Sequence, residues 1–341
     1  MVKIVATGDL MLGENSLYWG IGSRSIFEKK KIDFFQYTSH LFKNADIFLG
    51  NLECMLSSKT YGLVDDNTFI ASEDVVPQLK QSGINIMNIA NNHMLDRGPE
   101  LFDETVDILK KNNISHIGSY HQEPLIVECN GMSLCFMGMS VRPEQSYESC
   151  MKYERDAEYV ISEAARLKNL ADYLILSIHW GEEYLDYPDP IQVDLAHRLC
   201  DAGVDVIAGH HSHIFQGVER YGNSVIFYGL GNFISDMCQK KSKKGYAADL
   251  VLTGNKNIDY KLHYYEINRN YQPVLIENNK SVNELIIKNL NNQNYLQDIT
   301  DTIKLFRREY RIFLLLNFYR YPLIKLFMII FQAVLRKLKI R

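Results

Sequence analysis

The sequence of 341 residues lacks several features that mark common classes of protein. Its six cysteines are scattered, with no CxxC pair and no short spacing typical of zinc ligands, which argues against a zinc–thiolate site. There is no basic surplus, because 37 lysines and arginines stand against 41 aspartates and glutamates, so we expect no nucleic-acid partner. No secretory signal opens the sequence and several cysteines lie in apolar runs. We therefore expect reduced thiols and a cytoplasmic location.

Short apolar runs alternate with helical stretches up to about residue 235. Their near-continuous hydrophobicity predicts strands buried on both faces, as in a layered α/β fold. The runs occupy residues 3–7, 45–49, 84–90, 133–139, 172–178, 204–209 and 224–230. We expect helices over residues 33–43, 99–112, 154–169 and 189–201. Two further runs, 249–254 and 258–267, predict a closing hairpin.

Five of the apolar runs end in a short polar cluster whose side chains can bind metal ions. In open α/β sheets, ligand sites form beyond the carboxyl ends of the strands, so residues distant in the sequence converge there. Two carboxylates, one amide oxygen and three imidazoles form a ligand set suited to Mn, Fe, Zn or Mg ions. A bridge between two ions needs an oxygen ligand that touches both, and Glu53 is the natural candidate. The predicted metal ligands are Asp9, Glu53, Asn92, His179, His211 and His213.

Each cluster taken alone also has an ordinary structural interpretation. Asp9 could cap a turn, Glu53 could be a surface carboxylate, and a histidine inside an apolar strand, such as His179, is usually a satisfied core residue. His211 and His213, directly after an apolar run, give the strongest single signal because two imidazoles at this spacing can reach adjacent ions. The occurrence of all five clusters at strand ends favours a metal centre.

Six motifs occur in order within residues 3–236. They are GDLMLG (8–13), NLE (51–53), IANNHMLDRG (89–98), IHWGEEY (178–184), GHHSHIFQGVE (209–219) and FYGLGNFISD (227–236). Together they resemble the bacterial capsule-biosynthesis CapA family, also called the poly-γ-glutamate capsule synthesis family, of the metallophosphoesterase-like superfamily. The resemblance implies a four-layer α/β/β/α sandwich with a dinuclear metal centre at one edge of the sheets, here followed by a C-terminal helical extension.

The resemblance also implies a role for each candidate residue. Asp9 and His213 would hold one ion, and Glu53 would bridge to the second. The second ion would take Asn92, His179 and His211 as its other ligands. His93 would be the catalytic residue that donates a proton to the leaving group.

The sequence departs from the superfamily pattern in the first and last motifs. Ordinary phosphoesterases carry a histidine two residues after the first aspartate, but here the residue is Met11. Glu14 or Asn15 could supply the missing ligand, and a mononuclear centre stays open. Ser212 stands between the last two histidines, where the family commonly has proline.

Other polar residues of the motifs have less defined roles. Asp96 and Glu183 follow ligand positions closely and could orient imidazoles, as could His210. Trp180 is expected in the core. The glycine-rich residues 229–232 lack the following lysine and hydroxyl residue of a phosphate-binding loop, so no nucleotide site is predicted.

The predicted centre favours hydrolysis of a phosphoester by metal-activated water, in capsule or exopolymer biosynthesis. We expect a phosphorylated or polyanionic, polymer-related substrate and contact with capsule-synthesis machinery. Two alternatives remain open. One is a metallo-amidohydrolase that acts on a γ-linked peptide polymer, and the other is a non-catalytic scaffold of polymer synthesis or export at the membrane.

The chain changes character after residue 275. We expect a CapA-like domain over residues 1–275, an Asn-rich linker with a short helix over 276–306, and a basic amphipathic helical tail over 307–341. The tail contains nine lysines and arginines and one acid, and its longest clean apolar run is too short to span a bilayer. Peripheral contact with the inner face of the cell membrane is the favoured interpretation. The alternatives are a helical pair packed on the domain or on a partner, and a tilted insertion.

Overall fold

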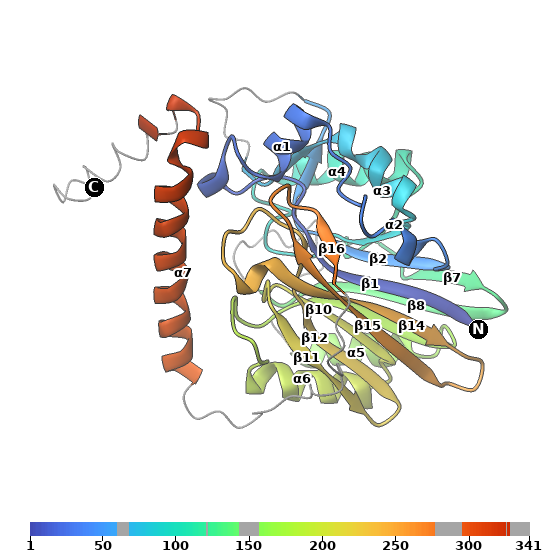
Figure 1. Ribbon diagram of the computed structural model, residues 1–341. Helices are drawn as coiled ribbons and strands as arrows, with labels where there is room; N and C mark the ends of the chain where they lie inside the picture. The colour runs from blue at the N-terminus through green and yellow to red at the C-terminus, as the bar shows by residue number, and fades with distance from the viewer. Residues whose placement is uncertain (60–67, 121, 143–156, 277–294, 325, 328–341) are drawn as a thin grey trace.

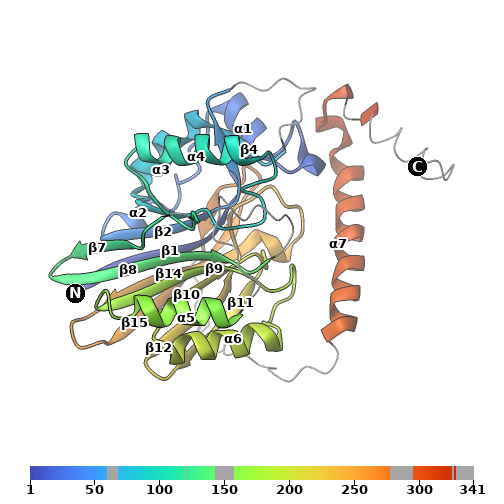
Figure 2. The same ribbon diagram turned by 180° about the vertical axis from the view of Figure 1, so that it is seen from behind.

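The computed structural model describes the chain except for residues 60–67, 121, 143–156, 277–294, 325 and 328–341. The described part has four layers, with helices on the outer faces of two stacked β-sheets (Figure 1), and Figure 2 shows the same layers from behind. One apolar core lies between the sheets, and one lies beneath each helical layer. The predicted four-layer α/β/β/α sandwich with a C-terminal helix is confirmed.

The first sheet is built around β1 (Val2–Leu10), which is buried along its length except at Lys3. It pairs in parallel with β2 (Ile47–Leu52) and antiparallel with β14 (Lys244–Leu252). The strand order is β16 (Pro273–Leu275), β15 (Ile258–Ile267), β14, β1, β2, β5 (Ile86–Asn88) and β6 (Ser115–Ile117), and β13 (Asn232–Ile234) pairs with the end of β1. The predicted closing hairpin is therefore the pair β14 and β15.

The second sheet stacks on the first and carries the other apolar runs. Its order is β11 (Phe215–Tyr221), β12 (Ser224–Leu230), β10 (Val206–His210), β9 (Tyr173–His179), β8 (Met132–Ser140) and β7 (Leu125–Cys129). Strand β9 runs parallel to both its neighbours and is buried at every residue, which explains its continuous hydrophobicity. A separate parallel pair, β3 (Met55–Ser57) and β4 (Ile70–Ser72), follows β2.

The outer layers are helical. Helices α1 (Ser23–Lys30), α2 (Ser39–Phe42), α3 (Val76–Ser82) and α4 (Pro99–Lys111) cover the first sheet, and α5 (Ala157–Leu167) and α6 (Pro190–Asp201) cover the second. Helix α6 begins with Pro190, and the Asp189 carboxylate and the Gln192 side chain close a capping box around its first turn. Local sequence therefore sets where this helix starts.

Several elements differ from the sequence prediction, and helices α1 and α3 and the short strands β3, β4, β6, β13 and β16 were not predicted. The helix expected over residues 33–43 is wrong for its first half, because only Ser39–Phe42 is helical. Asp33 Oδ1 accepts a 2.9 Å hydrogen bond from Phe35 N, and such a side-chain turn competes with helix formation. Strands β7 and β11 were not predicted, since each is only partly buried and therefore lacks a continuous apolar run.

Helix α7 (Tyr295–Asn317) lies along the edge of the sandwich at which β1 ends, opposite the chain's N-terminus (Figure 1). It crosses residue 306, where the sequence placed the boundary between linker and tail. Residues 277–294 of the expected linker and 328–341 of the expected tail lie outside the described residues, so the proposed division of the chain stays a prediction. Within the described part, none of the helices combines the length and the apolar character needed to cross a membrane.

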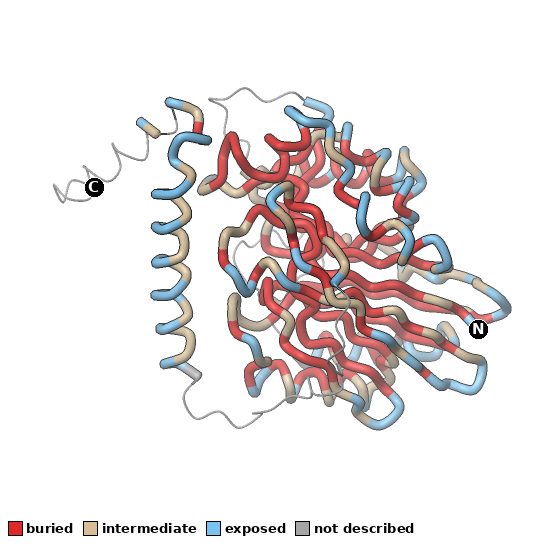
Figure 3. Tube along the Cα trace, viewed as in Figure 1, coloured by how far each residue is buried: buried red, intermediate tan, exposed pale blue. Residues whose placement is uncertain are grey.

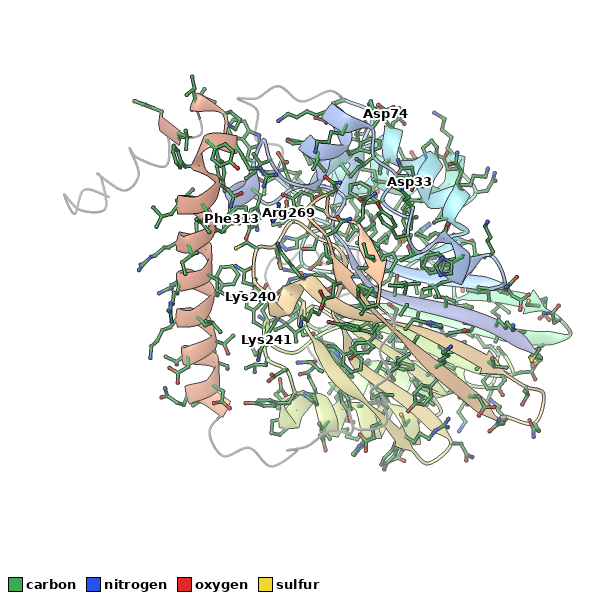
Figure 4. All side chains as sticks on the ribbon, in the orientation of Figure 1. Asp33, Asp74, Lys240, Lys241, Arg269 and Phe313 are labelled. Carbon is green, nitrogen blue, oxygen red and sulfur yellow. The ribbon has the colours of Figure 1, made fainter. Side chains whose placement is uncertain are left out.

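One face of α7 packs on the domain. The ring of Phe313 meets the ring of Tyr18 edge to face at 5.5 Å, and Tyr321 Oη donates a 2.9 Å hydrogen bond to the Leu17 carbonyl. Figure 4 shows Phe313 on the helix and Lys240 on the facing loop along this seam, where Lys240 N donates to Glu309 Oε2. Helix α7 therefore packs across the edge of the sandwich at which β1 ends.

Candidate metal centre

The predicted metal ligands from both sheets meet at one edge of the sandwich. Asp9 is the eighth residue of β1, and Glu53 directly follows β2. His179 is the last residue of β9, and His211 and His213 follow β10. All five side chains are buried, with at most 1% of each residue exposed. Convergence of strand ends therefore occurs as the α/β pattern predicts.

One group of candidate ligands combines Glu53, His179 and His211, whose ligand atoms all lie within 4.8 Å of one another. His179 Nε2 lies 3.7 Å from Glu53 Oε1 and 3.0 Å from His211 Nδ1. Asn92 joins the group, because its Oδ1 lies 2.7 Å from His179 Nε2. These are the four residues that the resemblance implies for one ion and its bridge.

A second group combines Asp9, Glu53 and His213 within the same limit. His213 Nδ1 lies 3.4 Å from Asp9 Oδ2 and 3.8 Å from Glu53 Oε2. Glu53 thus presents one carboxylate oxygen to each group. This is the geometry that a bridging carboxylate requires.

The surroundings of the Glu53 carboxylate show whether the candidate ligands suit metal ions. Both of its oxygens are buried, and neither makes a hydrogen bond to any residue that the structure describes. Buried carboxylates without partners are rare because desolvation of the charge is costly. Burial raises the pKa of Glu53 well above its usual range, and the neighbouring Asp9 charge adds to the effect although His213 opposes it. A cation between the two groups would satisfy these oxygens, so the donor set fits divalent metal ions.

The imidazoles of the centre differ in protonation. Burial lowers the pKa of His179 and of His211 well below the usual value, so both rings are neutral and can offer a lone pair to a metal. His213 behaves differently, because although burial opposes its charge, the carboxylates of Glu53, Asp9 and Glu183 raise its pKa to about 10. Burial also opposes ionisation of Asp9, but hydrogen bonds and positive charge from His210 and His213 hold its pKa well below the usual range.

The histidine loop after β10 has an unusual backbone. His211 and His213 have φ angles of +88° and +55°, in the left-handed region that residues other than glycine rarely adopt. Such conformations cost about 1–3 kcal/mol each and cluster at functional sites. Gly209, in β10 just before this loop, is in a crowded position, since a Cβ atom there would lie 2.1 Å from the Tyr228 carbonyl oxygen.

His93, the predicted proton donor, lies beside the first group. Its Nδ1 is 2.8 Å from Asp96 Oδ2, and its ring stacks on Phe69 with centroids 3.7 Å apart. Its Nε2 lies 3.3 Å from Asn92 Nδ2. Asp96 is therefore placed to orient the imidazole, a role that the sequence left open, and the opposite nitrogen of His93 faces the candidate ligand Asn92.

Several neighbouring residues resolve the remaining sequence alternatives. His210 Nδ1 lies 3.1 Å from Asp9 Oδ1, so this histidine supports a candidate ligand. Trp180 is packed in the core and donates from Nε1 to the Tyr228 carbonyl. Glu14 does not supply the ligand that is missing because residue 11 is methionine. Its carboxylate pairs with Arg24 at 2.9 Å and accepts hydrogen bonds from backbone amides of the following loop.

Asn15 does not provide that ligand either. Its side-chain oxygen accepts a 2.9 Å hydrogen bond from Leu17 N and caps a short helical turn, Ser16–Tyr18.

Buried asparagines that were not predicted from the sequence position Asp9 and contact His213. Asn51 Nδ2 donates a 2.9 Å hydrogen bond to Asp9 Oδ1, and Asn88 Nδ2 donates to Asn51 Oδ1 at 3.0 Å. Asn232 Oδ1 lies 2.9 Å from His213 Nδ1. All three asparagines are buried at the ends of strands. None of the three lies directly beside a predicted ligand in the sequence, since even Asn51 is separated from Glu53 by Leu52, so no local pattern marks them.

Helix α7 reaches the centre through aromatic side chains. The Phe306 ring lies 4.7 Å from the Tyr184 ring, which in turn lies 5.8 Å from the His213 ring. Tyr187 Oη also donates a 2.7 Å hydrogen bond to Asp298 Oδ2. The helix thus covers the loop that follows β9 at the edge of the candidate centre.

The chain is similar to known proteins of bacterial capsule synthesis. The family described as "Bacterial capsule synthesis protein PGA_cap" matches residues 3–237. The chain is 30% identical over 260 residues to the capsule biosynthesis protein CapA of Bacillus anthracis, across 71% of this chain and 62% of that protein. It is 29% identical over 242 residues to the PGA biosynthesis protein CapA of Bacillus subtilis, across 67% of this chain and 62% of that protein. The match thus spans less than two thirds of these relatives.

A solved structure described as a novel phosphatase from Mycoplasma pneumoniae shares the fold, with a TM-score of 0.50 at 13% identity over 77% of this chain and 92% of that one. The chain therefore has a metallophosphoesterase-like fold, with candidate metal ligands grouped at one edge of its sheets. Among proteins with this fold, the chain belongs to the bacterial capsule synthesis family PGA_cap, as its motifs indicated.

Proposed function

We propose that this protein is a metal-dependent hydrolase that cleaves a phosphoester during the synthesis of a capsule or related surface polymer. The observation that carries the proposal is the buried, unpartnered carboxylate of Glu53, which faces one group of nitrogen and oxygen donors on each side. The family's role in capsule synthesis supports the biological setting. The phosphoester chemistry is our inference from the donor set and the class of fold.

We assign the ligands by their groups. Asp9 and His213 bind one ion, Asn92, His179 and His211 bind the other, and Glu53 bridges them. The nitrogen and oxygen donors suit Mn, Fe or Zn, with Mg as a further option. Bound ions would lower the pKa of a coordinated water and neutralise charge on the phosphoryl oxygens.

The residues of the chain supply the remaining functions. Asp96 holds the imidazole of His93 by the 2.8 Å contact, so that Nε2 points toward the group that contains Asn92. A proton on that nitrogen can pass to the leaving oxygen of a substrate held at the centre. His210 and Asn51 fix Asp9 from the protein side. A phosphorylated or polyanionic part of a polymer precursor is the proposed substrate class.

The test is turnover of bis(p-nitrophenyl) phosphate by the protein loaded with Mn²⁺. We expect His211→Ala to abolish turnover. His197→Ala is the matched control, because His197 pairs with Glu219 at 3.0 Å and lies outside the candidate ligand groups. A protein that binds metal but cleaves only a γ-linked glutamate peptide would be an amidohydrolase. A protein without metal or turnover that co-purifies with polymer machinery would be a scaffold.

We also propose peripheral membrane contact through the outer face of α7. The side of the helix turned away from the domain is exposed along its length (Figure 3). Large apolar side chains lie exposed on this helix and directly after it, namely Leu296, Leu315, Leu316, Phe318, Tyr319, Leu323 and Phe327. Arg311 and Arg320 lie among them, and apolar side chains with basic neighbours suit an anionic lipid surface.

Vesicle flotation tests this contact. We expect the full chain to float with phosphatidylglycerol vesicles and less with phosphatidylcholine vesicles, and we expect Leu315→Glu with Leu316→Glu to reduce flotation. Lys304→Glu is the control for a general charge effect, since Lys304 pairs with Asp301 away from this apolar set. Equal flotation of the wild type and the double variant would contradict the proposal.

A further inference from the structure

The loop after β9 brings one more carboxylate to the centre. Glu183 Oε1 lies 3.8 Å from His213 Nε2. Glu183, His211 and His213 form a third group whose ligand atoms all lie within 4.8 Å of one another. The loop is held in place because Tyr184 N donates a 2.8 Å hydrogen bond to the Ser212 carbonyl.

The distance between Glu183 and His213 suits two ligands of one ion. A separation of 3.8 Å is too long for a hydrogen bond. Two donor atoms that each lie about 2.1 Å from a common ion can be up to about 4.2 Å apart. The same holds for the contact of His179 with Glu53 at 3.7 Å. The distance between Glu183 and His213 is therefore as compatible with a shared ion as the distance between Glu53 and His179.

The hydrogen bonds around His213 decide which of its nitrogens can bind an ion. Asn232 Nδ2 donates to the Ser242 carbonyl at 3.1 Å, which turns Asn232 Oδ1 toward His213 Nδ1 at 2.9 Å. An acceptor at Nδ1 places the proton of a neutral imidazole there and leaves the lone pair on Nε2. In the ion-free protein His213 holds a proton on both nitrogens, because neighbouring carboxylates raise its pKa to about 10. Loss of the Nε2 proton would give an ion a lone pair on the side of Glu183.

His211 adds an independent observation to this third group. Its Nε2 is buried and makes no hydrogen bond within the described part of the chain, while its Nδ1 faces His179. A buried nitrogen without a partner, in a group with a carboxylate and a second imidazole, is an environment that a cation would complete.

We propose that Glu183 is a metal ligand and that it binds the ion held by His213 through Nε2. The inference rests on the proposed function, because it requires a centre that binds divalent ions. With Asp9 and Glu53, Glu183 gives the centre a third carboxylate to balance the charge of the ions. Its side chain is 35% exposed, whereas that of His213 is 2% exposed, so Glu183 lies on the solvent side of this group.

The experiment compares Glu183→Gln with Glu182→Gln in the full chain. Glu182 belongs to the same loop, but its carboxylate pairs with Arg142 at 2.8 Å and takes no part in the three groups. Equilibrium dialysis against Mn²⁺ gives the number of bound ions and their Kd. The visible absorption spectrum of Co²⁺-loaded protein reports the ligands of the bound ion, and unfolding in EDTA checks that both variants fold.

We expect Glu183→Gln to lose one Mn²⁺ per chain or to raise the Kd of the weaker ion at least tenfold, with a changed Co²⁺ spectrum. Glu182→Gln should match the wild type in both. Unchanged binding by Glu183→Gln would overturn the inference and leave the proposed function intact. Weaker binding with an unchanged Co²⁺ spectrum would also overturn it, because Glu183 would then only orient His213. A wild type that binds neither ion would refute the proposed function and this inference together.

Discussion

Removal of the charge from two buried glutamates of this protein should lower its stability in different ways. Glu14 and Glu53 are both fully buried. Glu14 pairs with Arg24 at 2.9 Å and accepts hydrogen bonds from backbone amides, whereas neither oxygen of Glu53 makes a hydrogen bond within the described part of the chain. If Glu53 exists to bind metal ions, Glu53→Gln should weaken only the stability that metal provides. Glu14→Gln should weaken the fold with or without metal.

The expected magnitudes follow from linkage and from the cost of breaking a buried pair. A metal ion at 100 times its Kd stabilises the folded state by about 2.7 kcal/mol. If Glu53→Gln raises the Kd about 100-fold, only about 0.4 kcal/mol of this stabilisation remains at the same concentration. The loss of about 2.3 kcal/mol corresponds to roughly 5 °C in Tm for a large domain. Glu14→Gln removes one charge of the buried 2.9 Å ion pair with Arg24, which costs about 3–5 kcal/mol.

The assay is thermal and denaturant unfolding of the wild type and both variants, in EDTA and in Mn²⁺. In EDTA, Glu53→Gln should lie within about 1 kcal/mol of the wild type, because an amide replaces a carboxyl that already lacks partners. In Mn²⁺ it should lose most of the metal-dependent gain. The reasoning is refuted if Glu53→Gln is equally destabilised in both buffers, or if the wild type gains no stability from Mn²⁺.

Three further predictions follow from the same geometry. His93→Gln should lower kcat for an aryl phosphodiester by about 10²–10⁴ without changing the metal content, as expected for loss of a proton donor; an unchanged kcat would exclude that role. Asp96→Asn should lower kcat by a smaller factor of about 10–100 because it loosens the imidazole of His93, and steady-state kinetics of both variants will show whether that order holds. Gly209→Ala should destabilise the protein by about 1–3 kcal/mol, measured by urea unfolding, because its Cβ would lie 2.1 Å from the Tyr228 carbonyl oxygen. A variant as stable as the wild type would contradict this expectation, because β10 and β12 would then tolerate a Cβ atom at this position.

The sequence predicted the layered fold and the meeting of the ligands for one physical reason. Strands buried on both faces must be largely apolar, as β9 is up to its last residue His179, so a polar cluster at the end of such a run marks the strand end. His179 and His211 were found in this way. Elements with one solvent-exposed face, such as β7 and β11, carry a weaker hydrophobic pattern and were not predicted.

The supporting residues of the centre could not be predicted because their roles depend on contacts between distant strands. Asn51 binds Asp9 only because β1 and β2 lie in register. The commitment of Glu14 to Arg24 likewise arises from the path of the loop before α1. Neither contact leaves a spacing pattern in the sequence, so a ligand role for Glu14 was a reasonable prediction that the structure corrects.

The central claim is that Glu53 bridges two divalent ions between strand ends of the two sheets. Anomalous diffraction from crystals grown with Mn²⁺ tests it most directly. We predict two anomalous peaks about 3.5–4 Å apart, one beside His179 and His211 and one beside His213, each in contact with an oxygen of Glu53. Peaks that lie away from Glu53, or a Mn²⁺-saturated crystal without a peak at this edge of the sheets, would contradict the account.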